Sequence, residues 1–130
     1  MAIKPKTSGI HHLTLRSTDY ERSKDFYINK LGFDLILEIP NLFIFLAGQS
    51  AIAVRGPEAR TPAGDRFNPF RAGMDHVALG CSDLDELNRV ATELTENSIE
   101  NTGVKKDETL GKMYVAFKDP DRISWEFYMV

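Results

Sequence analysis

Two histidines and one glutamate are the side chains of this sequence whose types and positions suggest chemistry. His12 and His76 lie 64 positions apart, at the same place in the similar segments GIHHLTL and GMDHVAL. Glu126 lies in the apolar and aromatic segment SWEFYM, where an ionised carboxylate carries a large desolvation cost unless it is paired or binds a cation. A single strand histidine is more often a core or surface residue than a ligand. Two at equivalent positions, together with an isolated carboxylate, favour a metal site.

The similarity between the two segments continues along the chain and indicates an internal repeat. Residues 18–19, Thr-Asp, correspond to residues 82–83, Ser-Asp, and an apolar pattern with helical spacing follows both. A repeat of this length predicts two similar modules, each of which contributes one histidine. We expect module one at about residues 9–55, a connection at about 56–72 and module two at about 73–130, all within a single domain.

The first strand of each module must position its histidine. In the expected strand from Gly9 to Leu15, side chains alternate between the two faces, so His12 and Thr14 share one face and His11 points the other way. Asp75 occupies the place equivalent to His11. We therefore interpret His11 as an outward-facing polar residue without a counterpart in module two.

Each module continues with one helix and three further strands, so its order is β-α-β-β-β. Thr18 and Glu21 have the spacing of a capping box, and Gly32 ends the helix that they begin. The helix of module two is expected to be capped near Ser82. The further strands are expected at residues 33–39, 42–46 and 50–55, then at a short segment within 96–108, at 111–117 and at 123–129.

The composition excludes several classes of protein. With 130 residues, of which 42% are hydrophobic and 27% are charged, the chain has the composition of one compact domain with a core. A net charge of −3 and the lack of a basic cluster argue against nucleic acid and anionic membranes as partners. No apolar run approaches the roughly 20 residues that span a bilayer.

The single cysteine and the first residues of the chain bear on the cellular compartment. Cys81 has no second cysteine with which to form an internal disulfide, and we interpret it as a small buried residue. The initial segment MAIKPK lacks the apolar core of a signal peptide, so we expect cytoplasmic localisation. Trp125 and Phe127 flank Glu126 and are expected to pack against the helices.

The connection at residues 56–72 contains three prolines and three arginines and has no periodicity. It is either a plain linker or a mobile loop whose arginines meet an anionic substrate. The sequence leaves both interpretations open.

Several motifs are spread along the chain: GIHHLTL, Asp19, SKDFY at residues 23–27, LGF at 31–33, Asp119-Pro120-Asp121 and Glu126. Together they resemble the motifs of the vicinal-oxygen-chelate superfamily. Its members include glyoxalase I, extradiol dioxygenases, fosfomycin-resistance thiol transferases and metal-free bleomycin-binding proteins. The resemblance implies an α+β fold in which two βαβββ modules form an open, strongly curved mixed barrel with a metal on its concave axis. It also implies a small-molecule substrate and a homodimer.

The resemblance further implies a set of metal ligands. His12 and His76 match the first-strand ligands of the two modules, and Glu126 matches the last-strand carboxylate of module two. Ala53 takes the fourth position and cannot bind metal. The two imidazoles and one carboxylate that remain form the set of non-haem iron sites, which is also compatible with manganese or zinc. We therefore expect one divalent ion, Fe, Mn or Zn.

Among the family's reactions, the ligand set favours dioxygenase-like chemistry on a small substrate with adjacent oxygens. Against it, Ala116 stands at the place of the family's pocket tyrosine, and the chain has no fourth histidine to serve as acid or base. The lack of a carboxylate at Ala53 weakens a glyoxalase I-type reaction, although Arg16 matches an arginine that binds the thiol substrate. Thr14 matches a pocket threonine of the thiol transferases that open fosfomycin.

We expect Glu126 and Tyr114 to be catalytic and Thr14 and Arg16 to bind substrate. Tyr114 either lines the pocket or is solvated, and its position on a strand is compatible with both. A glyoxalase I-type lyase or isomerase, or a thiol transferase, is the alternative reaction. The alternative class of function is a non-catalytic protein that sequesters its ligand.

Overall fold

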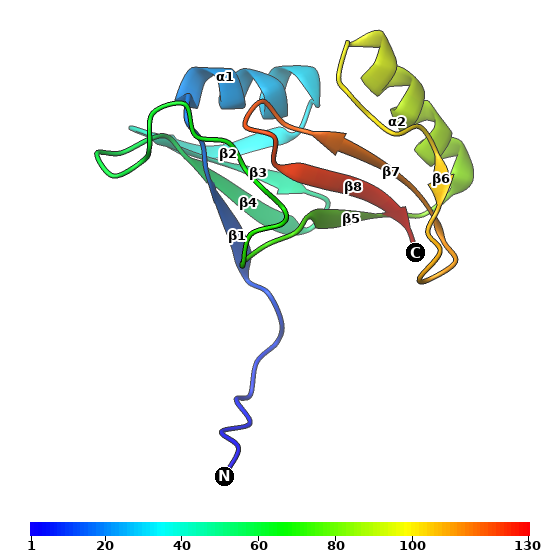
Figure 1. Ribbon diagram of the computed structural model, residues 1–130, viewed down its shortest axis with the longest axis horizontal. Coiled ribbons are helices and arrows are strands. Elements are labelled where there is room, and N and C mark those ends of the chain that lie inside the picture. Colours follow the sequence, from blue (N-terminus) through cyan, green and yellow to red (C-terminus); the bar gives the residue numbers. More distant parts are fainter. The chain divides into compact units, whose positions relative to one another are not determined.

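The strands and helices follow the same order in both halves of the chain (Figure 1). The computed structural model describes all residues, 1–130, and its internal contacts define two units, Met1–Arg60 and Thr61–Val130. Each unit contains one helical region and one four-stranded mixed sheet, which confirms the predicted α+β fold of two βαβββ modules. The closure of these modules into one barrel stays a prediction.

The first unit contains a sheet whose first and last strands are neighbours. The strand order is β1-β4-β3-β2, in which the β1–β4 pair is parallel and the other pairs are antiparallel. A parallel pair needs a long crossover connection, which the helix and the hairpins supply. The elements are β1 (His12–Arg16), α1 (Tyr20–Lys24), the π-helical segment η1 (Asp25–Lys30), β2 (Asp34–Ile39), β3 (Leu42–Ala47) and β4 (Ser50–Arg55).

The second unit repeats this topology with a much shorter second strand. Its strand order is β5-β8-β7-β6, again with a parallel pair between the first and last strands. The elements are β5 (Val77–Cys81), α2 (Leu84–Glu96), β6 (Lys105–Lys106), β7 (Met113–Lys118) and β8 (Ser124–Met129).

The register of the two parallel pairs makes the units directly comparable. Thr14 of β1 pairs with Ala53 of β4, and Ala78 of β5 pairs with Glu126 of β8. Thr14 and Ala78 are separated by the same 64 positions as the two histidines of the repeat. Ala53 is therefore the counterpart of Glu126 in the first unit, as the repeat predicted.

The first strand of each unit is shorter than expected. Strand β1 begins at His12 rather than at Gly9, whose φ of 113° is unsuited to a strand. Strand β5 begins at Val77, so His76 immediately precedes it. Both histidines thus lie at strand ends, where the backbone leaves the ladder. Cys81, at the other end of β5, is buried as predicted.

Aspartates begin both helical regions. Asp19 accepts a hydrogen bond from the backbone N–H three residues later at 3.0 Å, and Asp83 does the same at 2.7 Å. Both residues have extended backbones, with φ of −149° and −147°, which aims the carboxylate at the first helical turn. The predicted cap at Thr18 is therefore one residue too early, and the cap expected near Ser82 is Asp83.

The first helical region also changes type along its length. After α1 the turn widens into η1, where the Leu31 N–H donates to the Phe26 carbonyl at 2.9 Å, a five-residue spacing. An uninterrupted α-helix was expected up to Gly32. Neither helical region is long and apolar enough to cross a membrane.

Aromatic side chains form much of the core in each unit. In the first unit Tyr27 stacks on Phe45 with ring centroids 5.2 Å apart, and both side chains are buried. In the second unit Trp125 stacks on Phe117 at 6.4 Å and is only 1% exposed, which confirms its predicted burial. Phe127 is only half-buried. Full burial of one such side chain contributes about 1.5–3 kcal/mol to folding.

The helix caps give a direct test of the fold. Asp83→Ala should lower the free energy of unfolding by about 1 kcal/mol, because it removes the acceptor for a helix N-terminal N–H. Ser82→Ala is the matched control and should change it by less than about 0.5 kcal/mol. Urea unfolding followed by circular dichroism measures both, and a larger loss for Ser82→Ala would contradict the structure.

Candidate functional site

A hollow of about 430 Å³ opens on one face of the second unit's sheet. It collects side chains from β5, β7 and β8 and from the turn before β7. No lysine or arginine is among its lining residues. These residues are His76, Ala78, Asp107, Thr109, Leu110, Tyr114, Glu126 and Tyr128.

His76 and Glu126 meet in this hollow. The parallel pairing of β5 with β8 brings the two ends of the second unit together, and His76 Nε2 lies 3.4 Å from Glu126 Oε1. The other ring nitrogen, Nδ1, lies 2.7 Å from Asp75 Oδ1. The side chain of His76 is 40% exposed and that of Glu126 is 18% exposed, so the glutamate is the more deeply placed partner.

The environment of Glu126 disfavours its charged form. Burial raises the pKa of its carboxyl above the usual value, the neighbouring His76 opposes this shift, and the carboxylates of Asp107 and Asp75 add to it. Such a carboxylate is stabilised by a bound cation or by a proton. The desolvation inferred from the apolar sequence around Glu126 is therefore present in the structure.

A second polar pair, which the sequence analysis missed, lies in the same hollow. Tyr128 Oη donates to Asp107 Oδ2 at 2.6 Å, and the backbone N–H groups of Thr109 and Leu110 also donate to this carboxylate, at 2.9 and 3.3 Å. These hydrogen bonds, that of Tyr128 first, hold the pKa of Asp107 below its usual value. Burial and the Asp107 carboxylate raise the pKa of Tyr128 to about 12, so its hydroxyl remains protonated at neutral pH.

Tyr114 also lines this hollow, which agrees with the first of its two interpretations, a pocket residue rather than a solvated one. Its ring stacks on that of Tyr128, with centroids 6.1 Å apart and planes at 18°, because the two residues are paired across β7 and β8. Strand alternation from Glu126 was a signal that could have identified Tyr128. Asp107 lies in a turn, where no periodicity indicates which way a side chain points.

His12, the third predicted metal ligand, belongs to the first unit. It is exposed at the start of β1, and its Nδ1 lies 2.8 Å from His11 Nδ1. The two rings meet edge to face with centroids 5.1 Å apart. The expectation that His11 points away from His12 is wrong, because His11 precedes the strand and does not follow its alternation.

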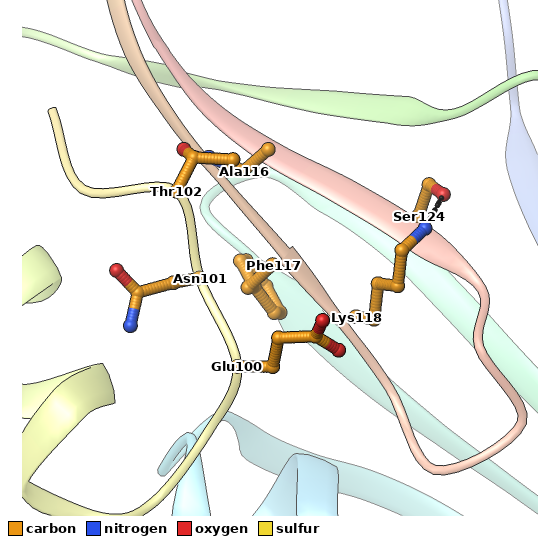
Figure 2. A pocket seen from close by; sticks show the side chains of 7 residues that line it. All are labelled: Glu100, Asn101, Thr102, Ala116, Phe117, Lys118 and Ser124. Atoms are coloured by element: carbon orange, nitrogen blue, oxygen red, sulfur yellow. Dashed lines mark hydrogen bonds between the residues drawn. The ribbon is translucent and has the colours of Figure 1, made fainter. Parts of the chain in front are cut away.

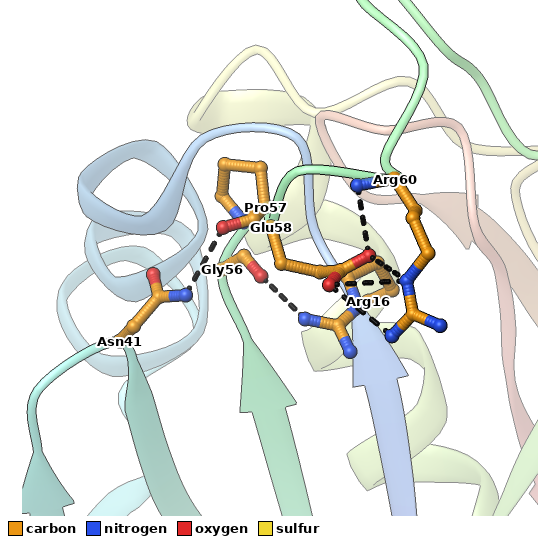
Figure 3. A network of polar contacts seen from close by, with 6 residues as sticks. All are labelled: Arg16, Asn41, Gly56, Pro57, Glu58 and Arg60. Carbon is orange, nitrogen blue, oxygen red and sulfur yellow. Dashed lines mark hydrogen bonds and ion pairs between the residues drawn. The ribbon is translucent and has the colours of Figure 1, made fainter.

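The two predicted substrate-binding residues also lie on β1. Thr14 is exposed beside Ala53. Arg16 donates from Nη1 to the Gly56 carbonyl at 2.7 Å, which ties the end of β1 to the chain that leaves β4 (Figure 3). A Cβ at position 56 would lie 1.9 Å from Asn41 Oδ1, so any residue larger than glycine would have to displace the Asn41 side chain. Their roles in binding substrate remain predictions.

The connection after β4 engages one of its arginines with a neighbour. Arg60 Nε lies 3.1 Å from Glu58 Oε1, and Asn41 Nδ2 donates to the Pro57 carbonyl at 3.1 Å (Figure 3). The hydrogen bond from the Arg60 side chain is the main reason why the pKa of Glu58 is lowered. Both interpretations of the connection, a plain linker or a substrate-binding loop, therefore remain predictions.

A smaller hollow of about 130 Å³ lies between β7 and the segment that follows α2 (Figure 2). Ala116, at the place of the family's pocket tyrosine, lines this hollow, and Lys118 Nζ donates to Ser124 Oγ at 2.9 Å across its end. It lacks a histidine and carboxylate pair. The larger hollow is therefore the candidate site.

Two donors of the predicted metal site, His76 and Glu126, lie in the second unit, and the third, His12, lies in the first. His76 and Glu126 place an imidazole nitrogen and a carboxylate oxygen 3.4 Å apart, and these donor types are suited to iron, manganese or zinc. No group of three or more His, Cys, Asp or Glu side chains that could hold a metal ion is present. The structure thus contains two of the three predicted ligands together in one unit.

Comparison with known proteins identifies the family. The Glyoxalase/Bleomycin resistance protein/Dioxygenase superfamily matches residues 9–127. The chain belongs to this superfamily. The resemblance of the sequence motifs is therefore confirmed, and the superfamily's fold agrees with the two βαβββ modules.

Individual relatives of this superfamily member extend over nearly the whole chain. The Bacillus subtilis protein YwkD is 34% identical over 131 residues, which cover 92% of this chain and 95% of YwkD. A glyoxalase family protein from Enterococcus faecalis is 26% identical, with a TM-score of 0.73 and coverage of 93% and 97% of the two chains. A lactoylglutathione lyase from Agrobacterium tumefaciens is 22% identical, with a TM-score of 0.75 and 96% coverage of both chains, and this likeness shows the fold alone.

The raised pKa of Glu126 predicts a pH-dependent stability difference. In chelator-treated protein, Glu126→Gln should be more stable than the wild type at neutral pH. The free energy of unfolding of the wild type falls as the pH rises toward the raised folded-state pKa of Glu126, because the folded protein must then hold a buried charge. The difference should vanish below about pH 3, where the wild-type carboxyl is neutral in both the folded and the unfolded state. Urea unfolding at several pH values measures it. Glu108→Gln, at an exposed position in the same unit, is the control, and an equal gain for both variants would contradict the assignment.

Proposed function

We propose that this superfamily member is a metal-dependent enzyme that performs dioxygenase-like chemistry on a small molecule with two adjacent oxygens. The observation that carries the proposal is the contact between His76 Nε2 and Glu126 Oε1, 3.4 Å apart inside the hollow of the second sheet. These residues would bind one ion of iron, manganese or zinc. The repeat suggests His12, the histidine of the first unit, as the third ligand.

The chemistry of the donors supports a metal more than a simple ion pair. A partly buried carboxylate whose pKa is raised gains stability from a cation, and the imidazole beside it supplies a second donor atom. A divalent ion held by two imidazoles and one carboxylate keeps open positions, at which a substrate with adjacent oxygens can be activated.

The other side chains of the hollow suggest how this chain would hold its substrate. The Tyr128 hydroxyl is held by Asp107, so its ring is fixed and offers a flat face. Tyr114, stacked on it, is the residue we propose as a hydrogen-bond donor to a substrate oxygen. Leu110 lines the same hollow with an exposed side chain and would offer an apolar contact to the substrate. Glu126 would accept a proton from the substrate through a carboxylate oxygen that does not bind the ion.

The pairing of the first sheet favours this chemistry over the glyoxalase I-type alternative. Ala53 lies at the counterpart of Glu126, so the first unit offers no carboxylate at that position for a second glutamate ligand. Arg16, which would bind a thiol substrate, donates to a backbone carbonyl. The lactoylglutathione lyase from Agrobacterium tumefaciens keeps the lyase reaction as the second candidate, on fold alone.

We also propose that the protein forms a homodimer. Its edge strand β2 exposes four apolar side chains, a row that monomeric proteins rarely leave in water. These are Leu35, Ile36, Leu37 and Ile39, which are 38–51% exposed.

The first experiment tests metal binding and reaction on the same sample. Chelator-treated protein should bind one divalent ion and melt several degrees higher with excess Fe(II), Mn(II) or Zn(II), because a ligand that binds only the folded state stabilises it. His76→Ala and Glu126→Ala should each abolish the shift. Glu96→Ala, which removes an exposed carboxylate at the end of α2, should retain it.

The loaded protein is then offered catechols, methylglyoxal with thiols, and fosfomycin with thiols. Turnover of a catechol with consumption of dioxygen supports the proposal, and turnover of either other pair would replace it with the corresponding alternative reaction. Identical melting curves with every metal and with chelator would remove the metal site and favour a ligand-sequestering protein.

The missing carboxylate of the first unit provides a second test. Ala53→Glu should tighten metal binding, because another anionic oxygen joins the ligand set, and should suppress dioxygen chemistry by closing an open position. Ala53→Gln is the matched control of equal size without the charge, and it should tighten metal binding less. Chelator competition measures the affinities. Since Ala53 is 5% exposed, unfolding curves must show that both variants fold, and unchanged affinity in a folded Ala53→Glu would refute the placement of this position beside the metal.

A further inference from the structure

We infer that Asp75, the residue before His76, is a positioning residue that sets the tautomer of the histidine ring. It holds the proton on Nδ1, so that Nε2 presents its lone pair to the hollow. The inference concerns the ring in the metal-free protein, and its consequence for metal affinity rests on the proposed function.

The hydrogen bond of Asp75 determines which nitrogen carries the proton. A carboxylate only accepts hydrogen bonds, so at 2.7 Å from Asp75 Oδ1 the Nδ1 atom of His76 must be the donor. In the neutral ring this leaves Nε2 without a proton. Glu126 Oε1 is farther from Nε2, at 3.4 Å, and does not form a comparable hydrogen bond that would draw the proton to that side.

The first unit repeats this arrangement with a different residue. His11 precedes His12 as Asp75 precedes His76, and the Nδ1 atoms of His11 and His12 lie 2.8 Å apart. Two neutral rings can make this contact only with one proton between the two nitrogens. When His12 provides that proton, its Nε2 is left with a lone pair, as in His76. Both units therefore engage Nδ1 of the repeated histidine through the preceding residue.

The two arrangements differ in strength. Asp75 accepts with a negative charge, which also raises the electron density of the His76 ring, whereas His11, when it accepts from His12, does so with an uncharged ring nitrogen. A carboxylate behind a ligating histidine commonly changes metal affinity by about 10- to 100-fold. Because Asp75 is 73% exposed, we expect the lower end of that range.

The experiment compares two substitutions of one exposed residue. Asp75→Asn keeps an oxygen that can accept from Nδ1, whereas Asp75→Ala removes it. Long-range proton–nitrogen NMR of the metal-free protein, at a pH where the ring is neutral, should show the Nδ1–H tautomer in the wild type and in Asp75→Asn. In Asp75→Ala the ring should shift toward the Nε2–H tautomer, and Asp83→Asn, another aspartate in the same unit, should leave it unchanged.

Metal affinity provides the second readout. Chelator competition should show about a 10-fold loss for Asp75→Ala and a smaller loss for Asp75→Asn. An unchanged tautomer in Asp75→Ala overturns the inference. If the wild type binds metal, an equal metal affinity of Asp75→Ala overturns it as well. If the wild type binds no metal but the tautomer shifts as expected, the positioning role stands and the proposed function fails.

Discussion

The parallel pairing of the first and last strands of each unit is the constraint on which the candidate site depends. His76 and Glu126 are 50 positions apart in the chain, and they meet only because β5 and β8 lie side by side. The helix and the two intervening strands serve as the crossover that such a pair requires. A change of one residue in the register would turn Glu126 to the opposite face of the sheet and place Trp125 in the hollow.

In the candidate site a carboxylate with a high desolvation cost, that of Glu126, lies next to a well-packed apolar layer. Trp125 and Phe117 stack on the buried side of the second sheet, while Glu126, between Trp125 and Phe127 in sequence, faces the hollow. Burial disfavours its charge, and the nearby carboxylates of Asp75 and Asp107 increase this effect. Groups that raise the electrostatic free energy of a fold in this way are common at binding and catalytic sites.

The two units show how a repeat can keep one topology while its chemistry diverges. The equivalent strand pairs have the same register, yet Ala53 and Glu126 occupy matching positions, and so do His11 and Asp75. The second unit thereby concentrates negative charge and tyrosines around its histidine. The strand pairing tolerates these differences because backbone hydrogen bonds, rather than the exchanged side chains, hold the sheet together.

The sequence by itself determined the order of the elements, the repeat, the equivalence of Ala53 and Glu126, the burial of Trp125 and the family. These features depend on local periodicity and on spacing along the chain, which a sequence displays directly. The metal site remains a prediction. Of its three proposed ligands, His76 and Glu126 lie next to each other in the structure.

Only the tertiary structure decided which side chains surround that pair. Asp107 enters the hollow from a turn, and Tyr128 becomes important through its hydrogen bond to it, across 21 positions of sequence. The contact of His11 with His12 depends on the path of the chain before β1, and the helix caps depend on single backbone angles. Such features follow from the conformation of irregular segments and from contacts between distant residues, and neither has a periodic signature in the sequence.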